Sequence, residues 1–239
     1  MENEASYRMR KSEWERFANE DAYSYICTEL SAGDAGSFWE SGEDTVEREL
    51  MPTVARYKVP RGTALEIGCG VGRLTLPMAR HFESIFGVDL AVGMISQANS
   101  LAEERGVQNA RFLIVDDPER LSAGIDSVRG KVDFVYSLLV LQHIDDFRLI
   151  EAYMRAVSGL LSRTGVAYLQ FDTRPKTLFY YFKTGLPDFV LRRNWRRGLR
   201  RIRRSPKELE LSFAKNKLKV LDNIEPSTEL HRYILQPGQ

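Results

Sequence analysis

The chain has 239 residues, 43% of them hydrophobic and 28% charged, with a formal net charge of +1 at pH 7. This length fits one α/β domain with additions, and the apolar content is sufficient for a proper core. The apolar runs fall short of the roughly 18 residues that span a membrane, and the acidic, polar start lacks the pattern of a secretory signal. We therefore expect a cytoplasmic protein. Its two cysteines are too few for a disulfide framework, and we expect no metal site.

Two helices are expected before the first strand. Residues 12–30 place aromatic and aliphatic side chains at helical spacing, and residues 31–34 break the pattern. Residues 41–56 repeat the helical spacing, and their first four residues, 41–44, offer capping groups and acids for a helix start. The stretch 1–44 is therefore interpreted as an N-terminal helical cap.

Strand and helix patterns then alternate as far as residue 171. Strands are expected at 63–67, 84–88, 110–115, 132–137 and 165–171, and helices at 73–81, 92–105 and 146–161, with a poorly patterned helix or loop at 118–130. Ser205 and Pro206 have the residue types of an N-cap and a first helical position, and strands near 217–224 and 230–236 follow. This order predicts a parallel sheet with helices on both faces.

A glycine-rich turn follows the first expected strand. Residues 64–73 read Ala-Leu-Glu-Ile-Gly-Cys-Gly-Val-Gly-Arg, and Asp89 stands at the end of the next strand. The glycines allow a sharp turn and close approach of a ligand, and the carboxylate can accept hydrogen bonds from ribose hydroxyls. The pattern therefore predicts a nucleotide-cofactor site. A dinucleotide fingerprint would need a glycine where Arg73 stands, which argues against a nicotinamide oxidoreductase.

These residues resemble the class I S-adenosylmethionine-dependent methyltransferases, whose first motif is an acidic residue, one further residue, then G-x-G-x-G. Segments similar to the later motifs follow in the family's order, at 85–89 with 94–95, 111–116, 133–144 and 160–171. The resemblance covers roughly residues 45–171. It implies a Rossmann-like, doubly wound, seven-stranded, mostly parallel sheet with an antiparallel last strand, N-terminal helices that cover the active site, and S-adenosylmethionine as cofactor.

The same resemblance divides the rest of the chain and assigns the site. Residues 45–171 would form the cofactor-binding core, 172–204 an insertion before the last two strands, and 205–239 the closing helix and those strands. The expected cofactor-binding residues are Glu66, Gly68, Cys69, Gly70, Gly72, Arg73, Asp89, Leu90, Met94, Asp116, Asp117, Ser137 and Leu138.

Individual roles follow for the acidic residues of this set. Glu66 would orient the ammonium group of the cofactor, or alternatively cap amides at its strand end. Asp89 would accept the ribose hydroxyls, and it could also cap the next helix. Asp116 would accept the adenine amino group while the Asp117 amide faces the ring, although both could be turn residues before Pro118.

Further candidates surround these acids. Met94 and Phe112 are candidate walls of the adenine pocket, or plain core. Ser137 and Leu138 fall at the carboxyl end of the fourth strand, where α/β sheets bind ligands and where the methyl group should emerge. His143 follows closely and could accept a proton from the methyl acceptor. Alternatively, His143 has a structural role, in which its ring holds the loop in place.

The insertion is rich in arginine. Residues 172–204 contain eleven Lys and Arg against two Asp, a net charge of +9, whereas the rest of the chain carries −8. Within residues 191–204, Leu191, Trp195, Leu199 and Ile202 would form one apolar stripe of a basic amphipathic helix. Such a helix could pack on its own domain as a lid, contact an anionic lipid surface, or bind nucleic acid.

The expected function is transfer of a methyl group from S-adenosylmethionine to an O or N acceptor on a small molecule. An RNA methyltransferase is the alternative that the arginines favour, but the chain has Ser-Leu-Leu-Val at 137–140, where such enzymes carry an Asn/Asp-Pro-Pro-Tyr/Phe type of motif. A non-catalytic docking module on the same fold is a further alternative.

Overall fold

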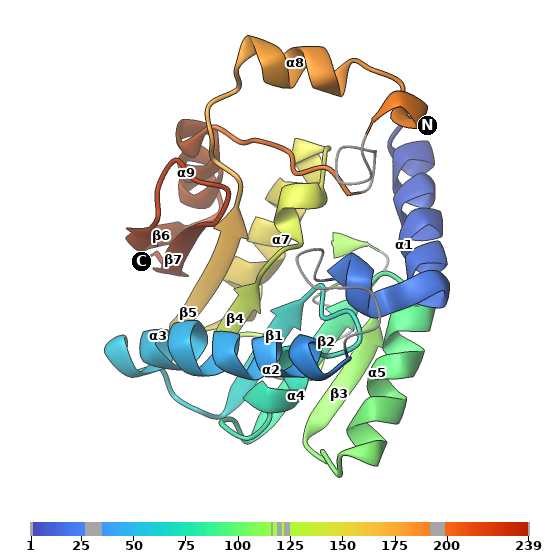
Figure 1. Ribbon diagram of the computed structural model, residues 1–239. Coiled ribbons are helices and arrows are strands. Elements are labelled where there is room, and N and C mark those ends of the chain that lie inside the picture. The colour runs from blue at the N-terminus through green and yellow to red at the C-terminus, as the bar shows by residue number, and fades with distance from the viewer. Residues whose placement is uncertain are drawn as a thin grey trace.

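A computed structural model describes residues 2–26, 35–115, 117–118, 121, 125–191 and 199–238. Within these residues a seven-stranded sheet has the order β3-β2-β1-β4-β5-β7-β6 (Figure 1). The strands are β1 Thr63–Ile67, β2 Ser84–Asp89, β3 Ala110–Ile114, β4 Val132–Ser137, β5 Leu161–Phe171, β6 Leu218–Ile224 and β7 His231–Pro237. The first five pair in parallel, and β7 is antiparallel to both of its neighbours. The predicted Rossmann-like fold is therefore confirmed.

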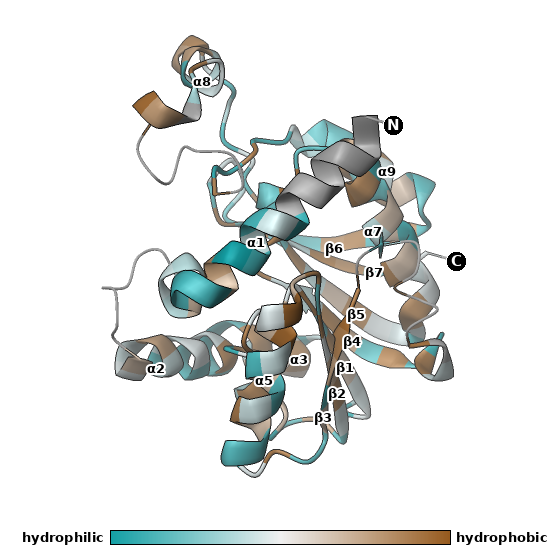
Figure 2. Cartoon of the chain, turned by 90° about the vertical axis from the view of Figure 1, so that its right-hand side faces the viewer, coloured by the Kyte–Doolittle hydropathy of each residue, from teal (hydrophilic) through white to brown (hydrophobic). Residues whose placement is uncertain are grey.

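The sheet is buried on both faces, and most residues of its central strands are apolar. All six residues of β4 are buried, as parallel strands covered by helices require. In β1, Leu65 and Ile67 point into one core, and Ala64 points into the core on the opposite face, as the two-residue period of a strand dictates. Figure 2 shows the apolar colouring along these strands.

The two faces are covered by different helices. The core on one face includes apolar residues of α7 (Phe147–Leu160) and α9 (Pro206–Lys215). The core on the other includes those of α3 (Met51–Arg56) and of the preceding π-helix Val46–Leu50. The remaining core helices are α4 (Thr75–Met78) and α5 (Val92–Glu104).

The N-terminal helices differ from their expected boundaries. Helix α1 spans Glu2–Ile26 and is kinked at Asp21, whose carboxylate accepts a hydrogen bond from the Ser24 amide at 3.2 Å. Helix α2 spans Ala35–Thr45 and runs through the π-helix into α3. The expected helix start at 41–44 was therefore wrong. The Ser41 hydroxyl donates to the Phe38 carbonyl at 2.7 Å from inside the helix, as mid-helix serines do.

Other boundaries shift by a few residues. The helix expected at 73–81 is limited to α4, and β5 begins at Leu161, four residues before the expected strand start. The helix behind Ser205 begins at Pro206 as predicted. The division of the chain into cap, core, insertion and closing segment stays our interpretation.

The insertion contains the short helix α8 (Leu178–Thr184) and a 3-10 turn at Asp188–Val190. Residues 199–204 are not helical, and Arg203 forms an isolated parallel bridge with Asp172. The predicted amphipathic helix over 191–204 was therefore wrong for its last six residues, while residues 192–198, with Trp195, lie outside the described part. In the described residues, no helix has the length and apolarity to cross a membrane.

Candidate functional site

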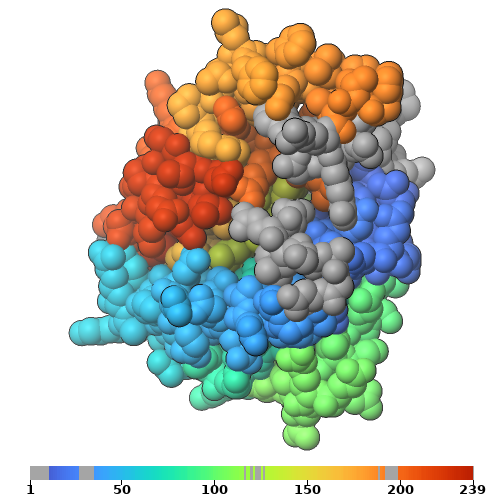
Figure 3. Space-filling view, in the orientation of Figure 1, coloured from blue at the N-terminus to red at the C-terminus, as the bar shows by residue number. Residues whose placement is uncertain are grey.

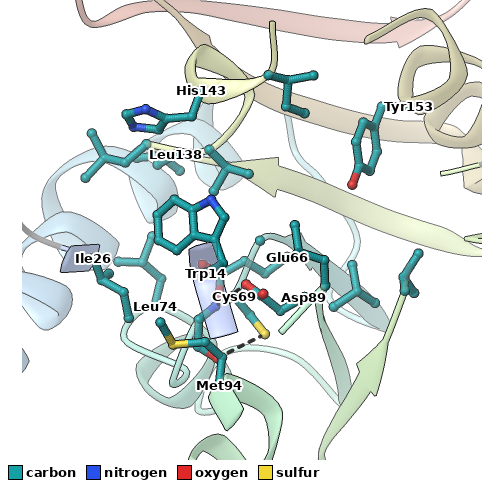
Figure 4. A pocket seen from close by; sticks show the side chains of 18 of the residues that line it. Trp14, Ile26, Glu66, Cys69, Leu74, Asp89, Met94, Leu138, His143 and Tyr153 are labelled. Carbon is teal, nitrogen blue, oxygen red and sulfur yellow. Dashed lines mark hydrogen bonds between the residues drawn. The ribbon is translucent and has the colours of Figure 1, made fainter. Parts of the chain in front are cut away.

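A pocket lies at the carboxyl ends of β1, β2 and β4, beneath α1 (Figure 4). The residues expected at the cofactor site that line it are Glu66, Gly68, Cys69, Gly70, Arg73, Asp89, Leu90, Met94 and Leu138, and His143 lines it as well. Most other lining side chains are aliphatic. The topology thus places a mainly apolar cavity with two carboxylates where doubly wound sheets bind ligands.

The backbone conformation of the loop after β1 explains why the loop is rich in glycine. Gly68, Gly70 and Gly72 have φ values of 75°, 53° and 89°, which side chains disfavour. The amides of Gly68 and Cys69 both donate to the Val88 carbonyl, at 2.7 and 3.0 Å. A Cβ on Gly70 would lie 2.7 Å from Ile26 Cδ1 of α1. The loop is thereby held flat against β2 and beneath the N-terminal helix.

Asp89 holds two backbone amides at the edge of the pocket. Its Oδ2 accepts a hydrogen bond from the Gly70 amide at 3.0 Å, and its Oδ1 accepts one from Ala91 at the start of α5, also at 3.0 Å. Burial raises the pKa of this carboxyl. Asp89 therefore orders the glycine loop and the helix start while it remains on the pocket wall.

Glu66 is held from beneath the pocket. Its Oε2 accepts hydrogen bonds from the Thr75 hydroxyl and, at 3.2 Å, from the Tyr136 hydroxyl. The side chain is 4% exposed, and burial raises its pKa to about 8. A carboxyl in this state favours a cation, because a nearby positive charge would stabilise its ionised form.

Three of the expected cofactor-binding residues that the structure describes do not line the pocket. Gly72 supports the loop from behind, where a Cβ would approach Leu76 and Phe112. Ser137 is fully buried and donates to the Ile67 carbonyl at 2.9 Å, which ties β4 to β1. Asp117 is off the pocket wall, and Asp116 lies outside the described residues.

Of the two candidate walls of the adenine pocket, Phe112 belongs only to the hydrophobic core. Met94 belongs to the core and also lines the pocket. Phe112 packs with Cys69 and the apolar face of α5, and it does not line the pocket. Val115 and Pro118, on either side of Asp116–Asp117, do line it.

Helix α1 contributes residues that sequence spacing did not single out as site residues. Trp14 and Ile26 line the pocket, and Figure 4 shows the indole between His143 on one side and Glu66, Cys69 and Asp89 on the other. The helix is docked on α5, since Glu15 Oε1 accepts from the Gly93 amide at 2.9 Å. The apolar pattern of 12–30 indicated a packed helix but not the cavity it packs over.

Helix α7 and the loop after β4 supply further residues that sequence reasoning missed. Leu149 and Tyr153 lie on one helical face, four residues apart, and both line the pocket, as do Leu139, Val140 and Ile144. Leu139 has a positive φ of 61°, so the chain turns sharply directly after β4. The i, i+4 spacing in α7 was the available signal, but it equally fits plain core.

His143 is hydrogen-bonded through both ring nitrogens. Nδ1 lies 3.2 Å from the Arg200 carbonyl oxygen, and Nε2 lies 3.3 Å from Gln142 Nε2. The carbonyl can only accept, so Nδ1 carries the proton and Nε2 is the acceptor nitrogen. Burial lowers the pKa of His143 to about 4. At neutral pH the ring is therefore uncharged, with its single proton on Nδ1, and it is a weak base.

Residues 199–204 form part of the roof over this histidine. The Ile202 amide donates to the Gln142 carbonyl at 2.6 Å. Arg204 donates to the carbonyls of Ile144 and Asp145, at 2.8 and 2.6 Å, and Arg201 forms an ion pair with Glu229 at 3.0 Å. These arginines therefore pack on their own domain, as the lid interpretation expected for the described part of the stretch.

The polar groups and the apolar walls of the pocket fit S-adenosylmethionine. Asp89 offers a carboxylate suited to hydroxyl groups, and Glu66 offers one suited to a cation. The aliphatic walls suit a purine ring, and the positive-φ glycines keep side chains out of the backbone turn. Fold and site together agree with the resemblance to the class I S-adenosylmethionine-dependent methyltransferases.

Comparisons with known proteins agree with this class. Residues 64–165 match the family model described as a methyltransferase domain. A ubiquinone biosynthesis O-methyltransferase from Brucella ovis is 26% identical over 163 residues, which cover 67% of this chain and 61% of the relative. One from Azorhizobium caulinodans is 32% identical over 128 residues, 54% of this chain and 47% of the relative. The chain thus spans at most about three fifths of the length of these two relatives.

Solved structures share the fold at low identity. An S-adenosylmethionine-dependent methyltransferase from Clostridium acetobutylicum has a TM-score of 0.65 at 18% identity, with 94% of this chain and 98% of that chain covered. Magnesium protoporphyrin IX methyltransferase from Synechocystis PCC 6803, with SAH bound, also has a TM-score of 0.65, at 21% identity and with 95% and 97% covered. Residues 64–165 of this chain therefore match a methyltransferase domain, and the chain shares the fold of these solved structures.

Proposed function

We propose that this protein transfers a methyl group from S-adenosylmethionine to an oxygen or nitrogen atom of a small-molecule acceptor in the cytoplasm. The observation that carries the proposal is the position of Asp89, which lines the pocket and accepts the amide hydrogen of Gly70 within the family's first motif. The bound cofactor supplies an activated methyl group on a sulfonium. The chain's own task is then to hold donor and acceptor in line and to exclude water.

The proposed division of the pocket follows its lining. Asp89, Leu90 and Met94 would hold the adenosine part, and Glu66 would face the ammonium group. The acceptor would lie between Leu138 and the roof, against Trp14 and Tyr153. Those walls are aromatic or aliphatic, which favours an acceptor with a substantial apolar part. The names of the Brucella and Azorhizobium relatives are consistent with a small-molecule acceptor.

A general-base role for His143 stays a prediction. Its position on the pocket wall and its unprotonated Nε2 support the role, whereas its low pKa and its bond with Gln142 favour a positioning role. Contact of residues 191–204 with an anionic lipid surface also stays a prediction. An RNA substrate is less well supported, because Arg200, Arg201, Arg203 and Arg204 all have partners within the chain.

Calorimetry with S-adenosylhomocysteine and NAD tests the proposal. We expect the native protein to bind S-adenosylhomocysteine and not NAD. Asp89→Ala should lower the affinity about 10-fold to 150-fold, because it removes charge-assisted hydrogen bonds worth roughly 1.5–3 kcal/mol.

A matched control is Asp133→Ala, a carboxylate remote from the pocket that accepts hydrogen bonds from the amides of Gly62 and Thr63. It should lose stability while the affinity of the folded protein stays near native. Unchanged affinity in Asp89→Ala, or tighter binding of NAD, would refute the cofactor assignment.

A further inference from the structure

Exposed apolar side chains are concentrated in one short part of the insertion. Of the nine large hydrophobic residues that are exposed in the described chain, six lie between residues 178 and 190. They are Leu178, Phe179, Tyr181, Phe182, Phe189 and Val190, with exposed fractions from 56% to 89%. We call these six residues the α8 surface. Figures 1 and 2 show that α8 projects away from the sheet and its covering helices.

Helix α8 is anchored to the body through the Tyr180 side chain and through the Thr184 carbonyl, which accepts a hydrogen bond from the Arg200 guanidinium at 3.3 Å. Tyr180 is 6% exposed. Its hydroxyl accepts a hydrogen bond from the Arg203 amide at 3.3 Å, and the Arg203 guanidinium lies 4.7 Å from the ring centre. After the 3-10 turn, Leu191 is again buried. The α8 surface is therefore fixed to the body at both ends, and its exposure does not come from an unattached tail.

An apolar surface of this kind indicates a binding partner, because the exposure of several adjacent aromatic side chains to water is unfavourable in free energy. The charge of the insertion indicates which kind of partner binds this surface. Lys176 is exposed beside α8, and Lys183 lies 4.5 Å from the Phe179 ring centre. The whole insertion carries +9 by sequence, against −8 for the remainder. Aromatic side chains flanked by lysines fit the interface of a negatively charged bilayer.

We propose that the α8 surface binds an anionic lipid bilayer. Phe179, Phe182 and Phe189 enter the boundary between head groups and acyl chains, and Lys176 and Lys183 remain at the level of the lipid phosphates. Attachment is peripheral, since the helix is seven residues long. The proposal does not depend on the methyl-transfer assignment.

The place of the α8 surface gives such binding a geometric consequence. Helix α8 follows the carboxyl end of β5, the edge of the sheet that also carries the pocket. In the space-filling view of Figure 3 the residues of α8, in orange, stand at the top of the molecule, and α2, in blue, lies below them. A bilayer contacted by α8 would thus lie on the pocket side of the sheet.

Vesicle co-sedimentation tests the proposal, with phosphatidylcholine vesicles and with vesicles that also contain phosphatidylglycerol, each at low and high salt. The native chain should bind only the anionic vesicles, and more weakly at high salt. The double variant Phe179→Ser, Phe182→Ser should lose at least about tenfold in affinity, since two aromatic side chains no longer enter the bilayer. Lys176→Gln with Lys183→Gln should weaken binding and reduce its salt dependence.

Leu211→Ser is the matched control, because Leu211 is 63% exposed but lies on α9, outside the α8 surface. It should bind vesicles like the native chain. Melting curves and affinity for S-adenosylhomocysteine should be near native in every variant, which separates this test from that of the cofactor. Unchanged vesicle binding by the double Phe variant would overturn the proposal. So would a native dimer, measured by analytical ultracentrifugation, that does not bind vesicles and that the same variant dissociates.

Discussion

Nδ1 of His143 lies 3.2 Å from the backbone oxygen of Arg200, which is 57 residues further along the chain. This contact joins the loop after β4 to the end of the arginine-rich insertion. It fixes the tautomer of the imidazole and, with the Ile202–Gln142 hydrogen bond, holds the insertion over the pocket. The position of residues 199–204 over the pocket therefore depends on this contact, whichever chemical role His143 has.

Replacement of His143 separates a chemical role from this structural one. As a general base, His143→Ala should lower turnover about 100-fold and leave the affinity for S-adenosylhomocysteine near native. The comparison is His231→Ala, which removes another buried histidine with a pKa lowered to about 4, bonded to Thr173 and remote from the pocket. If both variants lose stability and activity in parallel, His143 is a positioning residue.

The raised pKa of Glu66 predicts that Glu66→Gln has opposite effects on the stability of the protein and on cofactor binding. Its pKa is about 8 in the folded chain and about 4.3 when unfolded, so the folded state binds more protons between these values. The contribution of Glu66 to stability should therefore fall as pH rises from about 4.3 to 8. Glu66→Gln removes this penalty, and we expect it to stabilise the ligand-free protein at pH 8 by on the order of 2–4 kcal/mol.

The same variant should bind S-adenosylmethionine more weakly, because the amide offers no charge to the ammonium group. Urea unfolding at pH 5 and pH 8, with calorimetry at pH 8, measures both effects. A variant that is less stable than the native chain at pH 8 would contradict the burial argument. Unchanged affinity would place Glu66 outside the cofactor contacts.

Two helical glycines should respond to alanine with opposite signs. A Cβ on Gly42 of α2 would lie 2.4 Å from the Arg73 carbonyl oxygen, whereas one on Gly159 of α7 would meet nothing within 4 Å. We expect Gly42→Ala to cost roughly 1–3 kcal/mol through overpacking. Gly159→Ala should stabilise by about 0.5–1 kcal/mol through helix propensity. Thermal unfolding of the two variants beside the native chain is sufficient, and a stable Gly42→Ala protein would show that α2 can move away from the glycine loop.

The parts of the site that sequence analysis located are those set by local chain geometry. The glycine loop and Asp89 follow consecutive strands, and carboxyl ends of neighbouring parallel strands meet at one edge. Spacing alone therefore places them together. The same argument placed Leu138 and His143 after β4, and both line the pocket.

The roof of the pocket could not be found in this way. Trp14 comes from a helix that crosses the sheet edge, and Tyr153 from the pocket-facing side of α7, so each meets the site through tertiary packing. Residues 199–204 continue the apolar period of a helix, yet they are not helical, because the Ile202 amide and the Arg204 guanidinium bond carbonyls of the loop after β4. Tertiary hydrogen bonds there outweigh the local pattern.

The antiparallel strand β7 also affects how the chain can fold during synthesis. It is the last strand in sequence, and it lies between β5 and β6. Until residue 237 has left the ribosome, β5 ends the sheet as an open edge whose backbone groups have no neighbour on that side. A nascent chain therefore exposes the apolar edge of β5 while residues 172–237 are made, and an open edge of this kind is prone to pair with other chains in that interval.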